Sequence, residues 1–416
     1  MDKTTYEHHR KRLVECLPPE SAAVLFSGSE CRKSGDVFYE FFANRDFFYL
    51  TGLNEANAII VISKNECDEV REYLWVERRT EEHARWFGKR PNSESLEQQT
   101  GLPIYNYTEN FSTWLNTFLQ KNDYVIYLDL HDAADASPAY TLAETVRGCF
   151  PWIRFGDLHS IVSRLREIKS DAEIRAMKQG ITVAKDAVIK LMEQAKPGMS
   201  EYQLKALWDY TVSWQGVRDM AFQPIITSGE NNFIIHYSAY TRTIRPGDVI
   251  LLDAGVNWDG LCCDISRAWP VDTWFTEEEE LFYRCMLECS RDLFNYVKPG
   301  IQMRDVYRMQ RRIMRKRIVE FGLVPDEERA NRLIWHGGAH HIGYDNHDEV
   351  HISSHESRCV EPNMVFAIDI GLYDLEKNIG FRLEDDCLVT ENGSENLTAE
   401  IPRQLDELRA ILDCRY

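Results

Sequence analysis

Two stretches decide the fold: residues 248–270 read DVILLDAGVNWDGLCCDISRAWP, and residues 364–390 read MVFAIDIGLYDLEKNIGFRLEDDCLVT. Each has two apolar runs around a polar turn, which is typical of a β-hairpin. Folding the first about residues 258 and 259 places Asp253 opposite Asp264. Folding the second about residues 376 and 377 places Asp369 opposite Glu384. An alternative register of the first hairpin, slipped by one residue, would turn one aspartate to solvent.

These acidic pairs predict a metal site. Like charges that face each other inside apolar strands destabilise a hairpin unless a cation lies between them. The segment HGGAHHIGYDNHD (336–348) adds four of the 12 histidines, and its glycines argue against a helix and allow close backbone approach to a ligand. Four carboxylates with one imidazole favour Mn²⁺ or a similar divalent ion over structural zinc. Two such ions would hold a water molecule as the nucleophile.

Outward from these stretches, the chain divides near residue 165. Before it, helical and strand patterns alternate, which predicts a mixed sheet covered by helices. The expected elements are a helix at 5–16 and strands at 22–26, 47–50, 58–62, 72–76 and 124–128. After it comes LREIKSDAEIRAMKQGITVAKDAVIKLMEQA, a long helical run with Ser170 or Asp171 as its cap. We therefore predict two domains, 1–165 and 166–416.

The second domain contains an internal repeat. Lys196-Pro197-Gly198-Met199 and, 102 residues later, Lys298-Pro299-Gly300-Ile301 each lie between two helical patterns. Ser200 and Gln203 form a capping box at the start of the helix after the first copy. Two similar helical hairpins indicate a domain with two similar halves, although a three-residue match could also arise by chance.

Composition limits the partners. The 416 residues carry 48 Lys+Arg and 67 Asp+Glu, a formal net charge of −19, which disfavours nucleic acid and anionic membrane surfaces. The N-terminus leads into no apolar segment of the kind that exports a protein. The 11 cysteines include no CxxC pair, as expected for reduced thiols in the cytoplasm. Cys285 and Cys289 could hold a metal, but core packing is the simpler interpretation.

The order of the motifs resembles one family of metallopeptidases with the pita-bread fold, that of Xaa-Pro aminopeptidase (aminopeptidase P) and prolidase. The resemblance covers nearly the whole chain. The matching motifs are FFANRDFFYLTGLNE (41–55), RWFGKR (85–90), ITSGENNFIIHY (226–237), DAG (253–255), DISR (264–267), HGGAHHIG (336–343), AIDIGLY (367–373), FRLEDD (381–386) and ENLTAEIPRQLDEL (395–408). It implies an α/β (α+β) protein, with a mixed-sheet N-terminal domain and a pseudo-symmetric pita-bread catalytic domain.

The resemblance also implies the roles of single residues. The ligands of two divalent ions would be Asp253, Asp264, His340, Asp369 and Glu384, with Asp264 and Glu384 as the bridging carboxylates. Mn²⁺ is the expected metal, with Co²⁺, Zn²⁺ and Fe²⁺ as alternatives. His236 and His347 would act at the scissile bond, and Glu384 would pass a proton to the leaving proline nitrogen. Substrate-binding positions would be His336, Tyr373, Arg382 and Trp86. Trp86 would reach the site from a neighbouring subunit, as in oligomeric relatives, and the alternative is that it packs in the core.

Three departures from the family pattern concern the substrate. Asp369 stands where the family has the longer glutamate, Glu356 lies where bacterial relatives place an arginine, and the loop between Tyr373 and Gly380 is short. The expected function is removal of the first residue from peptides with proline second. Alternatives are a prolidase acting on dipeptides only, a relative with an altered substrate, and a catalytically silent binding protein. We expect a cytoplasmic homodimer or homotetramer with peptide substrates and no nucleic-acid or membrane partner.

Overall fold

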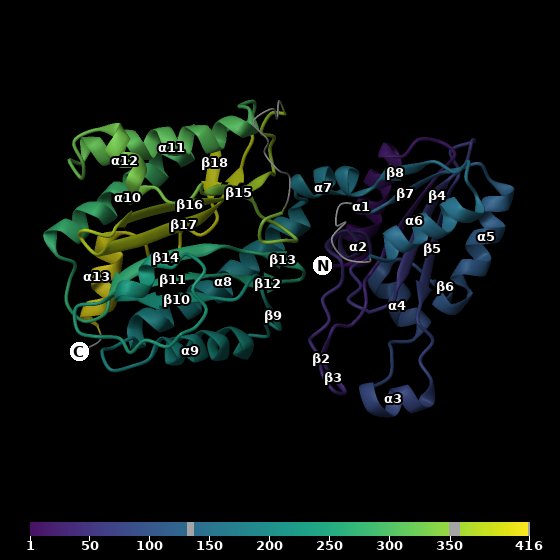
Figure 1. The fold of residues 1–416 in the computed structure, drawn as a ribbon, viewed down its shortest axis with the longest axis horizontal. Coiled ribbons are helices and arrows are strands. Elements are labelled where there is room, and N and C mark those ends of the chain that lie inside the picture. The colour runs from purple at the N-terminus through teal and green to yellow at the C-terminus, as the bar shows by residue number, and fades with distance from the viewer. Residues whose placement is uncertain (131–136, 349–357, 415–416) are drawn as a thin grey trace. The chain divides into compact units, whose positions relative to one another are not determined.

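The computed structural model describes residues 1–130, 137–348 and 358–414. Glu356 therefore lies outside the described residues. The chain divides into two compact units, Met1–Arg166 and Glu167–Tyr416. Figure 1 shows that each unit has its own sheet with its own helices.

The first unit is built on a six-stranded mixed sheet, as predicted. The strands are β1 (Ser21–Phe26), β4 (Ile59–Lys64), β5 (Val70–Val76), β6 (Ile104–Tyr107), β7 (Val125–Leu128) and β8 (Phe155–Asp157), in the order β6-β5-β4-β1-β7-β8. β1 pairs antiparallel with β4 and parallel with β7. The helices are α1 (Lys3–Cys16), α2 (Arg45–Thr51), α3 (Glu81–Phe87), α4 (Ser93–Thr100), α5 (Phe111–Lys121), α6 (Pro138–Cys149) and α7 (His159–Glu167). A short hairpin, β2 (Arg32–Ser34) and β3 (Val37–Phe38), stands apart from this sheet.

One expected strand of this unit is wrong, because residues 47–50 lie in the helix α2. The Asn44 side chain caps the helix by accepting a hydrogen bond from the Phe47 backbone N–H, and Gly52 ends it in the left-handed region at φ +65°. Three aromatic residues in a row favour a strand by propensity. The caps and the burial of Phe47, Tyr49 and Leu50 override that preference.

The second unit has a seven-stranded sheet between two pairs of helices. Its strands follow the order β10 (Ile225–Ser228), β11 (Val249–Ala254), β14 (Ile265–Pro270), β17 (Ile379–Val389), β16 (Val365–Asp374) and β15 (Ala339–His341), and β18 (Ser394–Asn396) also pairs with β17. β9 (Asp219–Met220), β12 (Val256–Trp258) and β13 (Leu261–Cys262) form a smaller sheet. The helices are α8 (Asp171–Gln194), α9 (Glu201–Trp214), α10 (Glu277–Tyr296), α11 (Met303–Glu320), α12 (Glu327–Leu333) and α13 (Leu405–Asp413). α10 packs on β16 and β17, while α8 packs on β12 and α9 on β10 (Figure 1).

The repeat predicted from the two Lys-Pro-Gly segments is present in the backbone. Gly198 and Gly300 separate α8 from α9 and α10 from α11, with φ angles of +89° and +87°. The Gly198 N–H donates to Ile244 O, and the Gly300 N–H donates to Val360 O, both at 2.9 Å. The same conformation and the same type of partner confirm two similar halves. The capping box of Ser200 and Gln203 is also formed, and Ser170, not Asp171, caps α8.

The cysteines and the membrane prediction can also be compared with the structure. All 11 cysteines are free thiols. Cys285 and Cys289 are buried on one face of α10, as in the core-packing interpretation. Among the described residues, no helix combines the length and the apolar character needed to cross a bilayer.

Candidate metal centre

The first acidic hairpin differs from the prediction in its register. Its turn residues are Asp259 and Gly260, both with positive φ (53° and 87°), and Asp253 pairs with Ser266 instead of Asp264. The prediction centred the turn one residue too early, which shifts every pair by two positions. Because side chains alternate with a period of two, Asp264 still lies on the same side of the hairpin as Asp253. Both aspartates are buried, so the slip by one residue that would expose one of them is excluded.

The second hairpin has the predicted register. β16 and β17 pair from Val365 with Leu388 to Asp374 with Ile379, and Asp369 lies directly opposite Glu384. β17 is buried along its whole length. The hairpin therefore holds two carboxylates side by side in the middle of the sheet.

His340 meets these carboxylates from the neighbouring strand, β15. Its Nε2 lies 3.6 Å from Asp264 Oδ2 and 3.7 Å from Glu384 Oε1, and the three side chains form a group that could hold a metal ion. Gly338 allows β15 to approach β16, because a Cβ there would lie 1.8 Å from the Asp369 carbonyl oxygen. The segment from His336 to Asp348 contains no helix, as predicted.

A cavity of about 590 Å³ opens over this group. All five predicted metal ligands line it, together with His236, His336, His347 and Arg382. His236 and His347 are exposed to the cavity, and the rings of His340 and His347 lie 4.1 Å apart. Phe222, Ile225 and Ile235 add an apolar part to the wall. The structure thus places ten of the eleven predicted site residues in one unit, nine of them around one cavity.

Three carboxylate oxygens of this site lack a hydrogen-bond donor. Asp253 Oδ1, Asp264 Oδ1 and Asp369 Oδ1 are buried and have no hydrogen-bond partner among the described residues. Burial, reinforced by the charges of neighbouring carboxylates, raises the pKa of Asp264 and that of Glu384 well above their ordinary values. Burial also raises the pKa of Asp253, although Arg382 opposes this shift. Buried carboxylate oxygens without donors are costly, and a bound cation would satisfy them.

Arg382 and Ser266 hold the first carboxylates in place. The Arg382 guanidinium donates to Asp253 Oδ2 at 2.5 Å and to Ser266 Oγ at 3.1 Å. The Ser266 hydroxyl in turn donates to Glu384 Oε2 at 2.9 Å. This chain of contacts fixes the rotamers of Asp253 and Glu384. The other oxygen of Asp253 has no hydrogen-bond partner among the described residues.

His336 and Tyr373 hold Asp369. His336 Nδ1 lies 3.0 Å from Asp369 Oδ2, and its Nε2 lies 3.0 Å from the Tyr373 hydroxyl. Burial acts to raise the pKa of Asp369, but the charge and hydrogen bond of His336, together with the nearby charge of Arg382, lower that pKa below its ordinary value. Tyr373 is buried and does not line the cavity. Tyr373 therefore contacts His336, and its role in binding substrate stays a prediction.

Three supporting contacts were not predicted. The Asn346 side chain donates to Asp264 Oδ2 at 2.9 Å, Gln310 donates to the Asp369 carbonyl oxygen at 2.5 Å, and the Asp264 N–H donates to Asp386 Oδ1 at 3.3 Å. Asp386 could have been anticipated, since it follows Glu384 by two residues and therefore shares its face of β17. Nothing in the sequence around Gln310 or Asn346 indicates these contacts.

Trp86 belongs to the other unit and is outside this cavity's lining. It lies in α3 with 77% of its surface exposed, which rules out the core-packing alternative. The short loop predicted between Tyr373 and Gly380 is the turn that joins β16 to β17.

Comparisons with known proteins agree with this arrangement. Residues 175–391 match metallopeptidase family M24, and residues 6–127 match the aminopeptidase P N-terminal domain. The chain belongs to metallopeptidase family M24. The buried acidic cluster lies in the M24 part, and the two-halved unit around it is the predicted pita-bread fold.

Relatives of this M24 metallopeptidase match it over the full length. Xaa-Pro aminopeptidase of Escherichia coli strain K12 is 29% identical, covering 99% of this chain and 98% of its own. The structure of zinc-substituted E. coli aminopeptidase P in complex with product has a TM-score of 0.91 at 29% identity, covering 100% of this chain and 99% of the other. Proline aminopeptidase P II from Yersinia pestis has a TM-score of 0.90 at 30% identity, covering both chains completely.

Proposed function

We propose that this metallopeptidase is an Xaa-Pro aminopeptidase, which removes the first residue from peptides that carry proline in the second position. The observation that carries the proposal is the cluster of buried carboxylates with unpartnered oxygens around one cavity. Relatives named Xaa-Pro aminopeptidase, aligned over almost all of both chains, support the substrate class.

The ligand set fits divalent cations. Asp253, Asp264, Asp369 and Glu384 supply hard oxygen donors, and His340 supplies one nitrogen, which suits two Mn²⁺ ions better than structural zinc. Each of the three aspartates lines the cavity and has one oxygen without a hydrogen-bond donor among the described residues. When bound, the ions would polarise the scissile carbonyl and lower the pKa of a water molecule toward neutrality.

The histidines of the cavity wall are placed to act on the substrate. We infer that His236 and His347, which are exposed on this wall, donate hydrogen bonds to the carbonyl oxygen as negative charge develops on it. His347 is held against the ring of His340, so its position is tied to that of a predicted ligand. Glu384 would carry the proton that the departing proline nitrogen requires.

The selectivity for proline has a physical origin. The nitrogen of the Xaa-Pro peptide bond is part of the proline ring and carries no hydrogen, so the site need not supply an acceptor for it. The acidic cluster suits the free N-terminal ammonium of the substrate. The apolar wall formed by Phe222, Ile225 and Ile235 offers a surface for the first side chain or for the ring.

The first experiment combines metal analysis with two substrates. The purified protein, supplied with Mn²⁺, should contain about two metal ions per chain and should cleave both an Xaa-Pro dipeptide and a longer Xaa-Pro-Yaa peptide. Cleavage of the dipeptide alone would make the enzyme a prolidase. Metal bound without either activity would indicate another substrate. Asp369 and Glu356, which depart from the family pattern, would then be the first residues to test as its cause. A protein that binds no metal would be the silent binding protein instead.

Three further parts of the proposal concern the setting of the enzyme. We propose a cytoplasmic homodimer or homotetramer, in keeping with the 11 free thiols and the exposed Trp86. In such an assembly Trp86 would close the site of a neighbouring subunit. Substitution of Trp86 by Ala should then raise KM without changing metal content, and sedimentation analysis gives the oligomeric state. The net charge of −19 leads us to expect no nucleic-acid or membrane partner.

A further inference from the structure

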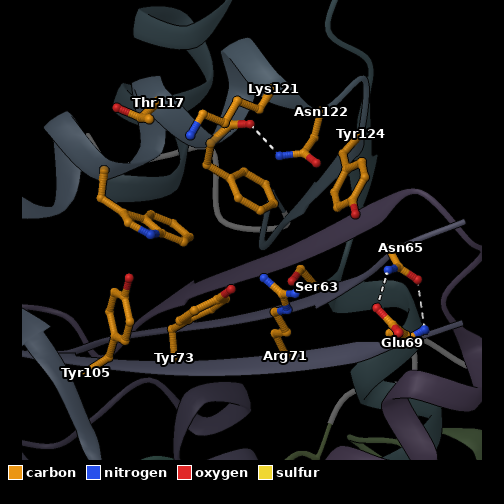
Figure 2. Close-up of a pocket in the computed structure, with 12 residues that line it drawn as sticks. Ser63, Asn65, Glu69, Arg71, Tyr73, Tyr105, Thr117, Lys121, Asn122 and Tyr124 are labelled. Atoms are coloured by element: carbon orange, nitrogen blue, oxygen red, sulfur yellow. Dashed lines mark hydrogen bonds between the residues drawn. The ribbon is translucent and has the colours of Figure 1, made fainter. Parts of the chain in front are cut away.

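The first unit has a cavity of its own, of about 460 Å³, between the sheet and the helix α5. Figure 2 shows side chains of β4, β5 and β6 on the sheet side and the last two turns of α5 on the other. Every residue that lines it belongs to Met1–Arg166. It is therefore separate from the metal centre, and the proposed function gives it no role.

The cavity forms where a core face of the sheet becomes uncovered. Trp75, Tyr73 and Arg71 alternate along β5 and so share one face, and Arg71 pairs across the sheet with Ser63 of β4. Trp75 is fully buried in the core of the unit, whereas Arg71 is exposed. One face of β5 is therefore packed in the core at Trp75 and lines the open cavity at Arg71, four residues away.

The helix α5 lines this cavity with side chains of a single helix face. Trp114, Thr117, Phe118 and Lys121 stand three, four and seven residues apart, which places them on a single face of α5. α5 ends at Lys121, which is therefore the last residue of this row.

Aromatic rings make the wall of the cavity rigid. The ring of Trp114 lies 5.0 Å from that of Tyr73 and stacks on that of Phe118 at 5.1 Å with 20° between their planes. The ring centroid of Trp114 also lies 5.2 Å from that of the buried Trp75, and the ring centroid of Tyr105 lies 4.8 Å from that of Tyr73. Rings fixed in this way form a preformed aromatic wall against which another planar group can pack at little entropic cost.

Two cations lie at the open end of this wall. Figure 2 shows Arg71 on the sheet side and Lys121 on the side of α5. Neither side chain makes an ion pair or a hydrogen bond with any residue in the described ranges. The one acid of the lining, Glu69, accepts a hydrogen bond from the Asn65 side chain at 2.8 Å, which holds it in the turn between β4 and β5. Two unpaired cations in a chain of net charge −19 mark a local site for an anion.

We propose that this cavity binds a small planar aromatic anion, with its ring against the Trp114 and Tyr73 side chains and its anionic group between Arg71 and Lys121. The volume lies within the range of small-molecule sites. The hydroxyl of Ser63, buried beside Arg71, adds a donor for the anionic group. Nucleoside phosphates and aromatic amino-acid or peptide carboxylates share this chemistry, and the experiment separates them.

The test is isothermal titration calorimetry on the full chain after removal of metal, so that the probes cannot bind to metal ions. One arm uses adenosine 5′-monophosphate with adenosine as its neutral counterpart. The other uses N-acetyl-L-tryptophan with N-acetyl-L-tryptophanamide. The variant is the double substitution Arg71→Gln and Lys121→Gln, whose two positions are exposed and so leave the fold intact. The control is Arg78→Gln, since Arg78 is an exposed cation of the same unit that pairs with Glu109.

At least one anion should bind, its neutral counterpart should bind about tenfold more weakly, and the double variant should lose affinity by a similar factor. The control variant should bind as the parent does. The arm that shows binding identifies the source of the ligand. Three results would overturn the proposal: no binding by either anion at millimolar concentration, equal binding of the neutral counterpart, or unchanged binding by the double variant.

Discussion

The protein contains two groups of aspartate and histidine with nearly the same composition and opposite chemistry. In the second unit, Asp264, His340 and Glu384 bring their ligand atoms together, and in the first unit Asp46, Asp129 and His159 do so. In the first unit both oxygens of Asp46 have donors, from His159 at 3.0 Å and Arg166 at 2.7 Å. In the second unit, one oxygen of Asp264 has none.

The pKa shifts follow this difference. Burial acts to raise the pKa of Asp46, but the hydrogen bond of His159 and the charge of Arg166 lower it below its ordinary value. Burial and neighbouring carboxylates instead raise the pKa of Asp264. The comparison teaches that residue types alone do not define a metal site. A cluster that contains its own cation is complete, whereas one with unpartnered buried oxygens requires a cation from outside.

The largest expected effect is a loss of peptidase activity when the Asp264 group is altered but not when the Asp46 group is altered. Substituting Asp264 by Ala should lower kcat/KM about 10⁴-fold or more, because the bound ions supply several kcal/mol of transition-state stabilisation. Asp46→Asn is the matched control, which should keep metal content and activity. Elemental analysis and peptide cleavage measure both. An Asp264→Ala protein with full activity would remove the metal centre from the mechanism.

The second effect concerns stability. Arg166→Met removes the guanidinium from the buried Asp46, leaves His159 as its remaining partner, and should cost about 3 to 5 kcal/mol of unfolding free energy. Urea denaturation followed by circular dichroism measures this loss. The double variant Arg166→Met with Asp46→Leu should recover a large part of it. If the single variant is as stable as the parent, the ion pair with Arg166 does not stabilise the buried Asp46 carboxylate.

The third effect is a gain in the free energy of unfolding. Asp264→Asn in the metal-free protein should increase the unfolding free energy by about 1 kcal/mol, because it removes one of several facing like charges. With Mn²⁺ present, the parent should become the more stable protein, because ligand binding stabilises the folded state. Thermal unfolding with and without metal checks this reversal, and a variant that is less stable in both conditions contradicts it.

The smallest effect is a pH dependence in the first unit. Burial acts to lower the pKa of His159, but its hydrogen bond to Asp46 raises that pKa above the ordinary value. The pair therefore contributes its full stability below about pH 6.5 and loses it as the pH rises through the higher folded pKa. The parent should lose stability between neutral and alkaline pH, and His159→Gln should not show this loss. Melting temperatures across that range measure it, and identical profiles would contradict the assignment.

Much of the fold and part of the site followed from local signals. The Lys-Pro-Gly segments, the capping box of Ser200 and the polar turn between two apolar runs predicted the repeat, a helix start and the pairing of Asp369 with Glu384. The register of Asp253 was wrong because the turn was centred on residues 258 and 259. The Asp259-Gly260 pair, a favoured dipeptide for this type of turn, was the signal for the correct centre.

By itself, the sequence determined which residues are candidates for the chemistry and on which strand faces they lie, because alternation and turn chemistry are local properties. Only the tertiary structure decided which carboxylate oxygens have donors. Arg382 reaches Asp253 from a strand 129 residues away in sequence, and Arg166 reaches Asp46 across 120 residues. Such partners depend on how distant elements pack, and they make one acidic group a candidate metal centre and the other an ion pair that contains its own cation.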